Sequence, residues 1–197
     1  MNLLAYIEEL FSLKIVGFLL THFTMIAILA PWAWVDSLEP YKAGTSGPNG
    51  LIFEKVRVYL SLWTTQLDEF TDKEDKNIWQ TIRICMALTL VFNIVEYLGL
   101  NIWAKGEISS LHHVILAVVN ALALLFLTIS LSMYAIKVDD MFAHLHTYDE
   151  TLFGTLNDDL EKMYFLAGPI SGLFSVGILI ILTYVHVYKW WTWAYIN

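Results

Sequence analysis

The sequence predicts an all-α integral membrane protein that folds as a four-helix bundle. The first observation is composition: of 197 residues, 57% are apolar and only 15% are charged, and the mean hydropathy is +0.58, which is outside the range of ordinary soluble domains. The second is length, because four segments each exceed the roughly 20 helical residues that cross a hydrocarbon core of about 30 Å. They cover residues 13–35, 77–103, 109–136 and 164–188.

Four crossings place both termini on one side of the membrane, which we call side A. The short turn 104–108 lies on the same side, and the long connections 36–76 and 137–163 lie opposite, on side B. Essentially all of the net charge of −8 belongs to side B and to Glu96, an acid within the second span. Side B is therefore expected to attract cations or a basic partner and to repel nucleic acid.

We predict a single membrane domain over residues 1–197. The acidic N-terminus differs from a signal peptide, so the first span is expected to be retained. Cys85, the one cysteine, lies within the second span, which excludes an internal disulfide. Lys and Arg are spread over both sides, so they do not orient the chain.

The long connections show patterns of their own. Residues 1–12 form an amphipathic helical lead-in, and residues 39–50, rich in Gly, Pro, Ser and Asn, indicate an irregular loop. Alternating apolar residues over 51–62 indicate a strand or hairpin edge, so a small β element is expected in the first long loop. Apolar residues at helical spacing over 141–160 predict either helices projecting on side B or an interfacial helix that caps the bundle.

The run Tyr59-Leu60-Ser61-Leu62-Trp63 lies in the first long loop, followed by Gln66 and Asp68. A four-span chain of this size, with a long first loop, a very short second loop and a Trp motif in the first, resembles the claudin and peripheral myelin protein superfamily. The run is also similar to the signature of the kinetoplastid amastins. Ser61-Leu62-Trp63 stands where the family has Gly-Leu-Trp.

Further positions match this resemblance. Pro31, Trp32 and Trp34 correspond to the Pro and Trp near the first helix, and Arg83 corresponds to the Arg at the start of the second. Gln66 stands where the first disulfide cysteine is expected, and a second cysteine is absent. The resemblance implies a left-handed four-helix bundle with a small sheet on side B, a cytoplasmic side A, and no enzymatic activity.

Several of these residues have two interpretations. The resemblance implies that Trp63 packs the sheet onto the helix ends as a plug, and the alternative is an ordinary anchor at the membrane interface. Arg83, about seven residues into its span, is expected to cap loop carbonyls rather than to serve transport. Gly168 and Gly172 have the spacing of close helix contacts, either inside the bundle or at a lateral interface.

Titratable groups gather in the half of the membrane nearest side A: His22, His112, His113, His186 and Glu96. Two histidines from different helices, such as His22 and His186, suit a b-type haem, and His with Glu suits a quinone or proton site. Ordinary interfacial histidines are the alternative. Asn93 and Asn120 are expected to hydrogen-bond between helices rather than to act as ligands.

No metal site is predicted on side B. Acids and histidines between 139 and 149 match no strong metal signature, and a solvated helix face explains them. Phosphate-cradling loops, nucleophile elbows and cysteine pairs are also lacking, so no catalytic residue is predicted. Enzymatic activity is not expected, except as a subunit of an enzyme complex.

The leading hypothesis is a non-catalytic membrane protein that acts by lateral packing, as a claudin-like organiser or as an accessory subunit of a larger complex, for example a respiratory one. Its expected partners are other integral membrane proteins and lipids, in a homo- or hetero-oligomer, with bound lipids and no other cofactor. The plasma membrane and the mitochondrial inner membrane both stay open. The alternative is a redox or transport subunit with a b-haem, quinone or proton site built from the five titratable groups.

Overall fold

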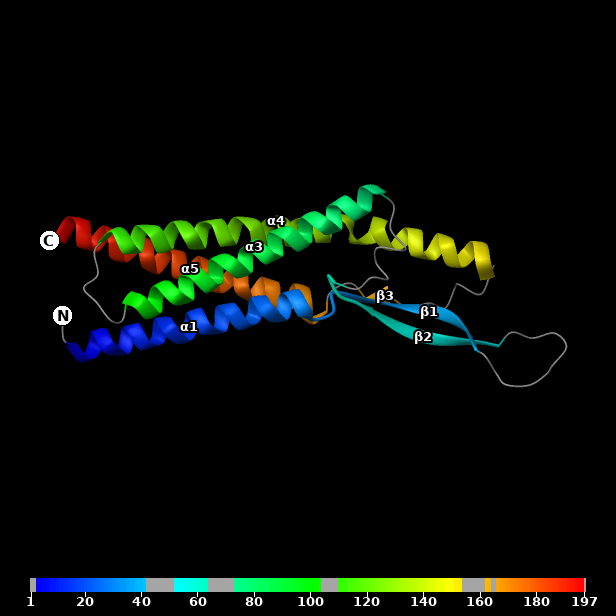
Figure 1. The fold of residues 1–197 in the computed structure, drawn as a ribbon, viewed down its shortest axis with the longest axis horizontal. Helices are drawn as coiled ribbons and strands as arrows, with labels where there is room; N and C mark the ends of the chain where they lie inside the picture. The colour runs from blue at the N-terminus through cyan, green and yellow to red at the C-terminus, as the bar shows by residue number, and fades with distance from the viewer. Residues whose placement is uncertain are drawn as a thin grey trace.

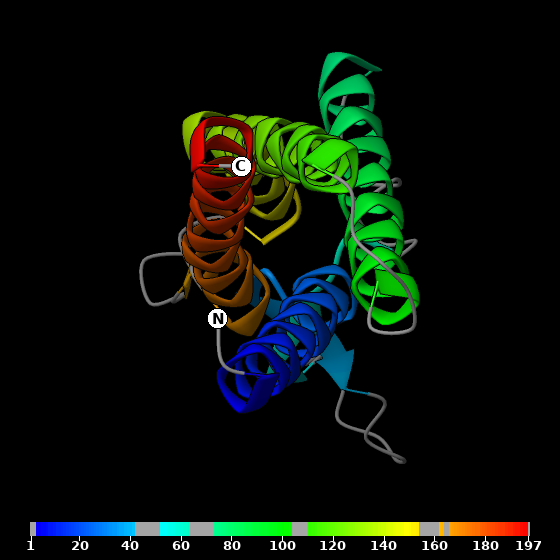
Figure 2. The same cartoon turned by 90° about the vertical axis from the view of Figure 1, so that its left-hand side faces the viewer.

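In this computed structural model, the described residues are 3–41, 52–63, 73–103, 110–153, 162–163 and 166–196. Four long helices lie side by side (Figure 1): α1 (Leu3–Leu29), α3 (Lys73–Trp103), α4 (Ser110–Phe153) and α5 (Ala167–Ile196). Seen along the bundle, each helix lies between two neighbours in the cyclic order α1, α3, α4, α5 (Figure 2). Both termini lie at one end (Figure 1), so the predicted four-helix bundle is confirmed.

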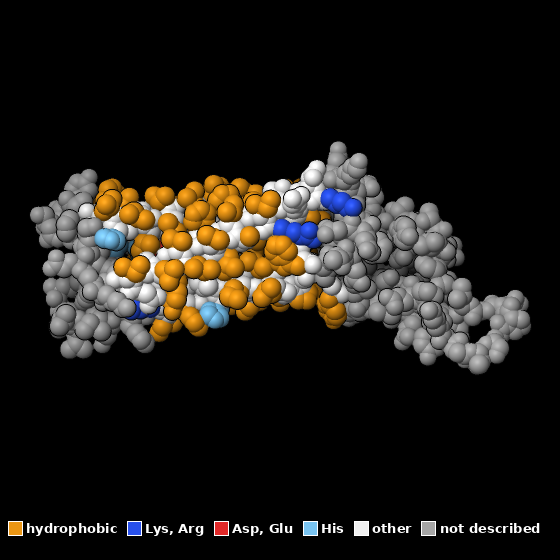
Figure 3. Space-filling view, viewed as in Figure 1, with side chains coloured by type: hydrophobic (Ala, Val, Ile, Leu, Met, Phe, Trp, Pro, Cys, Tyr) orange, Lys and Arg blue, Asp and Glu red, His pale blue; other side chains and the backbone are white. Residues whose placement is uncertain are grey.

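The bundle has the surface of a membrane protein. Three helical segments are long and apolar enough to cross a bilayer: Lys76–Ile102, Ser110–Val138 and Ala167–Thr192. The apolar part of α1 with described side chains, Leu13–Leu29, is shorter. Hydrophobic side chains cover the middle of the bundle, and Lys and Arg side chains lie toward its two ends (Figure 3). Outward-facing apolar side chains are stable in lipid and costly in water, which identifies an integral membrane protein.

A three-stranded antiparallel sheet stands on side B. It consists of β1 (Ala33–Tyr41), β2 (Ile52–Leu60) and β3 (Lys162–Met163), in the order β2-β1-β3. The register pairs Ala33 with Leu60 at the bundle end of the hairpin, and Trp34 with Met163 on the other edge of β1. The small β element expected in the first long loop is present, with β2 in the segment predicted for it.

The predicted end of the first span was wrong. It was expected to reach residue 35, but α1 ends at Leu29, because Pro31 has no N–H to continue the helical ladder and disfavours helix in the residue before it. The third span, predicted over residues 109–136, agrees with the apolar segment Ser110–Val138, and α4 continues beyond it to Phe153. Of the two alternatives for the second long connection, the projecting helix is therefore the one observed.

Candidate functional site

The bundle and the sheet meet around Trp32, which is completely buried. Trp32 follows the end of α1, and its indole lies back against that helix. There Nε1 donates to the carbonyl of Ala27 at 2.6 Å. The hydroxyl of Tyr134, on α4, donates to the Trp32 carbonyl at 3.0 Å, and the two rings meet edge to face at 4.7 Å between centroids. The indole N–H and the carbonyl of Trp32 thus both have hydrogen-bond partners, and the ring fills the space between α1 and α4.

The start of α5 rests on the same indole. Gly168 donates its N–H to the Pro31 carbonyl at 3.0 Å, and a Cβ at Gly168 would come within 2.5 Å of Trp32 Nε1. Only glycine fits in this contact, because a buried indole and a helix backbone cannot move apart cheaply. A Cβ at Gly172 would press against a leucine of α4 at 3.0 Å. Both glycines therefore pack inside the bundle, the first of the two predicted alternatives.

Arg83 connects α3 to the end of β2. Its Nε donates to the carbonyl of Leu62, a residue that is completely buried. The predicted role of Arg83 as a cap for a loop carbonyl is therefore confirmed. The guanidinium carbon lies 5.9 Å from the ring centroid of Trp63, an indole that is 51% exposed. Of the two alternatives for Trp63, this exposure fits the interfacial anchor and not the plug. The buried Trp32 occupies the space between the helices and the start of the sheet instead. We call Trp32, Leu62, Arg83, Tyr134 and Gly168 the bundle–sheet junction.

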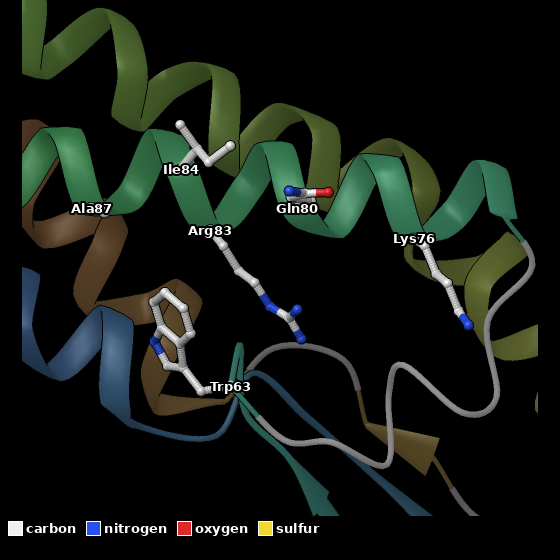
Figure 4. Close-up of a pocket in the computed structure, with 6 residues that line it drawn as sticks. All are labelled: Trp63, Lys76, Gln80, Arg83, Ile84 and Ala87. Atoms are coloured by element: carbon white, nitrogen blue, oxygen red, sulfur yellow. The ribbon is translucent and has the colours of Figure 1, made fainter.

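A cavity of about 500 Å³ opens beside this junction (Figure 4). Its lining comes from α3 and from the residue that follows Leu62: Trp63, Lys76, Gln80, Arg83, Ile84 and Ala87. The Arg83 side chain points from α3 toward the sheet, with the Trp63 ring beside it (Figure 4).

Replacing Arg83 with glutamine is expected to lower the free energy of unfolding by about 1–3 kcal/mol, because the buried Leu62 carbonyl loses a charged donor. Guanidinium or SDS unfolding of the purified chain in micelles measures this loss. Lys76→Gln is the matched control: it removes an exposed cation from the same helix and the same cavity, and is expected to change stability by less than about 0.5 kcal/mol. Equal losses in the two variants would show that charge alone, and not the Leu62 contact, is what Arg83 supplies.

A second polar constellation lies inside the membrane-spanning part of the bundle. Glu96 on α3, His186 on α5 and His113 on α4 converge, and their exposed fractions are 0%, 0% and 5%. His186 Nε2 is 2.8 Å from Glu96 Oε1, and His186 Nδ1 is 3.2 Å from His113 Nδ1. Among the described side chains Glu96 is the one acid. We call these three residues the intramembrane cluster.

The other two histidines predicted for this half of the membrane lie elsewhere. His22 is exposed on α1, where Nδ1 contacts the Phe18 carbonyl of its own helix at 2.8 Å. His112 is exposed on α4 beside the buried His113. Of the histidine pair named for the haem alternative, His22 is exposed, whereas both ring nitrogens of the buried His186 are in hydrogen-bond contacts. His113, His186 and Glu96 are the predicted residues that the fold brings together.

Further polar side chains are buried between the cluster and the middle of the bundle. Asn93 donates to Thr24 Oγ1 at 2.7 Å, and Thr24 Oγ1 lies 3.3 Å from Ser175 Oγ, so one chain of hydrogen bonds ties α3, α1 and α5 together. The predicted interhelical role of Asn93 is confirmed. Asn120 was expected to act in the same way, but neither of its side-chain polar atoms has a partner among the described residues. Glu96 Oε2 and Asn93 Oδ1 are also buried without partners there.

Two sequence predictions fall outside the described side chains. Trp34 is placed by its backbone in β1, opposite Tyr59, and its indole is not described. The acids and histidines between 139 and 149 lie on the distal part of α4, and their side chains are not described either. No protein-family model matches this chain, and no curated protein matches it.

Proposed function

We propose that this chain is a non-catalytic, claudin-like membrane organiser, which packs laterally against other integral membrane proteins while presenting its sheet on side B. The bundle–sheet junction carries the proposal. Trp32 and Tyr134 join α1 to α4, and Gly168 packs α5 against the same ring, so three helices hold Trp32, the residue directly before β1. Such a connection transmits the position of the bundle to a surface outside the bilayer.

The residues that carry the family resemblance support this reading. Trp32, Leu62 and Arg83 were singled out by motif alone, and they meet at the point where the sheet joins the helices. A small sheet beside a four-helix bundle is also what that resemblance implies.

How the sheet is held supports a proposal about the membrane. Two neighbouring strands and the buried Trp32 fix β1, and Cys85 is a free cysteine buried in α3. A sheet held without a disulfide supports an organelle or inner membrane over the cell surface, where disulfides form and persist. We therefore favour an accessory role within an organellar membrane complex.

The outer surface of the bundle supports packing against lipid or other helices. On α5 the outward side chains include Leu173, Phe174, Ile181 and Tyr184, each at least half exposed. An apolar surface of this type gains little from contact with another helix unless shapes fit closely, so partners are expected to be specific membrane helices rather than soluble proteins.

Mild detergent extraction from the native membrane, followed by native gel separation with an absorption spectrum of each band, tests the proposal. We expect migration within a large complex, without visible absorption attributable to this chain, and mass spectrometry of the band then identifies the partners. A stable monomer, unchanged by chemical crosslinking in the intact membrane, would contradict lateral packing. A small species with a haem spectrum that is lost in His186→Ala would instead establish the redox alternative.

A further inference from the structure

The intramembrane cluster is a continuous hydrogen-bonded chain. His186 contacts Glu96 through Nε2 and His113 through Nδ1, so the two nitrogens of one imidazole face opposite ends of the chain. A neutral imidazole accepts a proton at one nitrogen and releases one from the other. The arrangement is therefore that of a relay in which the central ring is connected on both sides.

The two contacts set the smallest number of protons that the cluster holds. The contact between two Nδ1 atoms needs one N–H, and the contact between His186 Nε2 and Glu96 Oε1 needs one proton on either atom. With both protons in place and His113 carrying its own proton on Nε2, the cluster is electrically neutral. Moving the proton from the Glu96 carboxyl to His186 Nε2 breaks one O–H bond and forms one N–H bond without changing that total.

Release of a proton toward side A uses the same contacts. The Glu96 O–H breaks as His186 Nε2–H forms, His186 Nδ1–H breaks as His113 Nδ1–H forms, and the proton on His113 Nε2 leaves to water. One proton is lost and the cluster gains one negative charge. Lys189 and His112 lie close enough for their charges to act on His113, and Lys189 counteracts that negative charge.

The cluster is enclosed by the bundle, and one of its oxygen atoms is not used. Glu96 is completely buried, and its Oε2 has no hydrogen-bond partner among the described residues. Asn93 lies one helical turn from Glu96 on α3, and its Oδ1 likewise lacks a described partner. The other titratable groups with described side chains in this half of the bundle are Lys14 and His22 on α1, Tyr97 on α3, and Tyr184 and Tyr188 on α5.

We propose that Glu96, His186 and His113 form an intramembrane proton-binding site, which exchanges one proton with side A through His113. The site is independent of the organiser role, since it lies at the opposite end of the bundle from the junction and uses none of its residues. A buried pair that serves only to hold helices together would instead stay ionised and would exchange no proton.

Infrared difference spectroscopy of the full-length chain in phospholipid nanodiscs tests the site with protons alone as the ligand. Between about pH 5 and about pH 8, we expect uptake of about one proton per chain, seen as a buried carboxylic acid C=O band. The band is expected to disappear in Glu96→Gln and to persist in His22→Gln, which removes an exposed imidazole from the same half of the membrane. Absence of such a band throughout this range would overturn the proposal.

Exchange in D₂O tests the route. His113→Gln is expected to slow the deuterium shift of the Glu96 band by about tenfold or more, because it removes the relay on the side A end. An exchange rate unchanged in His113→Gln would exclude the proposed route. If Glu96→Gln fails to fold, carboxyl-¹³C glutamate in the wild-type chain decides the matter: a band that shifts with the label assigns the proton to a glutamic acid, and an unshifted band refutes the site.

Discussion

Replacing Trp32 with alanine is expected to lower the free energy of unfolding by about 3–5 kcal/mol, the largest loss from one side chain at the bundle–sheet junction. The indole is completely buried, and its removal leaves the Ala27 carbonyl without its donor and takes from Tyr134 its edge-to-face ring contact. Neighbouring helices cannot close the space, because Gly168 has no side chain to fill it. Unfolding by SDS in mixed micelles, followed by circular dichroism, measures the change.

The control for this prediction is Trp63→Ala, which removes an indole that is 51% exposed. A loss below about 1 kcal/mol is expected there. Hydrogen exchange adds a second readout: in Trp32→Ala the amides of β1 near Ala33 should exchange faster, while those in the centre of α4 should not. Comparable losses in both tryptophan variants would mean that Trp32 does not hold the junction.

Substituting His186 with leucine is expected to lower the free energy of unfolding by about 1–3 kcal/mol, because it leaves a buried carboxyl group without its hydrogen-bond partner. Glu96 would then have neither carboxyl oxygen hydrogen-bonded to a described residue, at zero exposure. The same unfolding measurement applies. The comparison of interest is the double variant Glu96→Leu with His186→Leu, in which both polar groups are replaced by apolar ones.

The double variant is expected to recover most of the stability lost in the single one, since replacing both partners of a buried hydrogen bond by apolar groups of similar size costs little. If it does, stability does not require the cluster, and the double variant becomes a folded chain without the proton site. A double variant that is less stable than His186→Leu would show instead that the pair is a structural requirement of the bundle.

The helices were predictable because lipid leaves the backbone few choices. An unpaired N–H or C=O in hydrocarbon is so costly that a long apolar segment must be a helix, whatever its neighbours are. The first strand was not predictable in the same way. β1 contains Asp36, Glu39 and Pro40, which strands disfavour, and its backbone bonds come from β2 and from β3, more than a hundred residues later in the chain. Such pairing is a property of the assembled fold and leaves no local pattern.

The site was partly predictable, and a stronger signal was present in the sequence. Position along the membrane normal grouped four histidines in one half of the membrane. It did not show that His113 faces the interior and His112 the exterior, although neighbouring residues point about 100° apart around a helix. Buried residues of α4 follow spacings of three and four, and that stripe contains His113, Asn120 and Tyr134. In a membrane helix both faces are apolar, so polar residues at this spacing mark the interior. That rule selects His113, and it would have found Tyr134, which motif reasoning missed.

α4 is also a lever. Its 44 residues form one continuous helix about 66 Å long, more than twice the thickness of the hydrocarbon core. Beyond Val138, where the apolar span ends, about 22 Å of helix remain, so a change in tilt of about 10° at the bilayer moves the tip by about 4 Å. Slight reorientation of the bundle, from bilayer thickness or from a neighbouring protein, is therefore magnified into a displacement at the far end of the arm. A helix held in lipid over Ser110–Val138 thus carries a membrane deformation to its distal end.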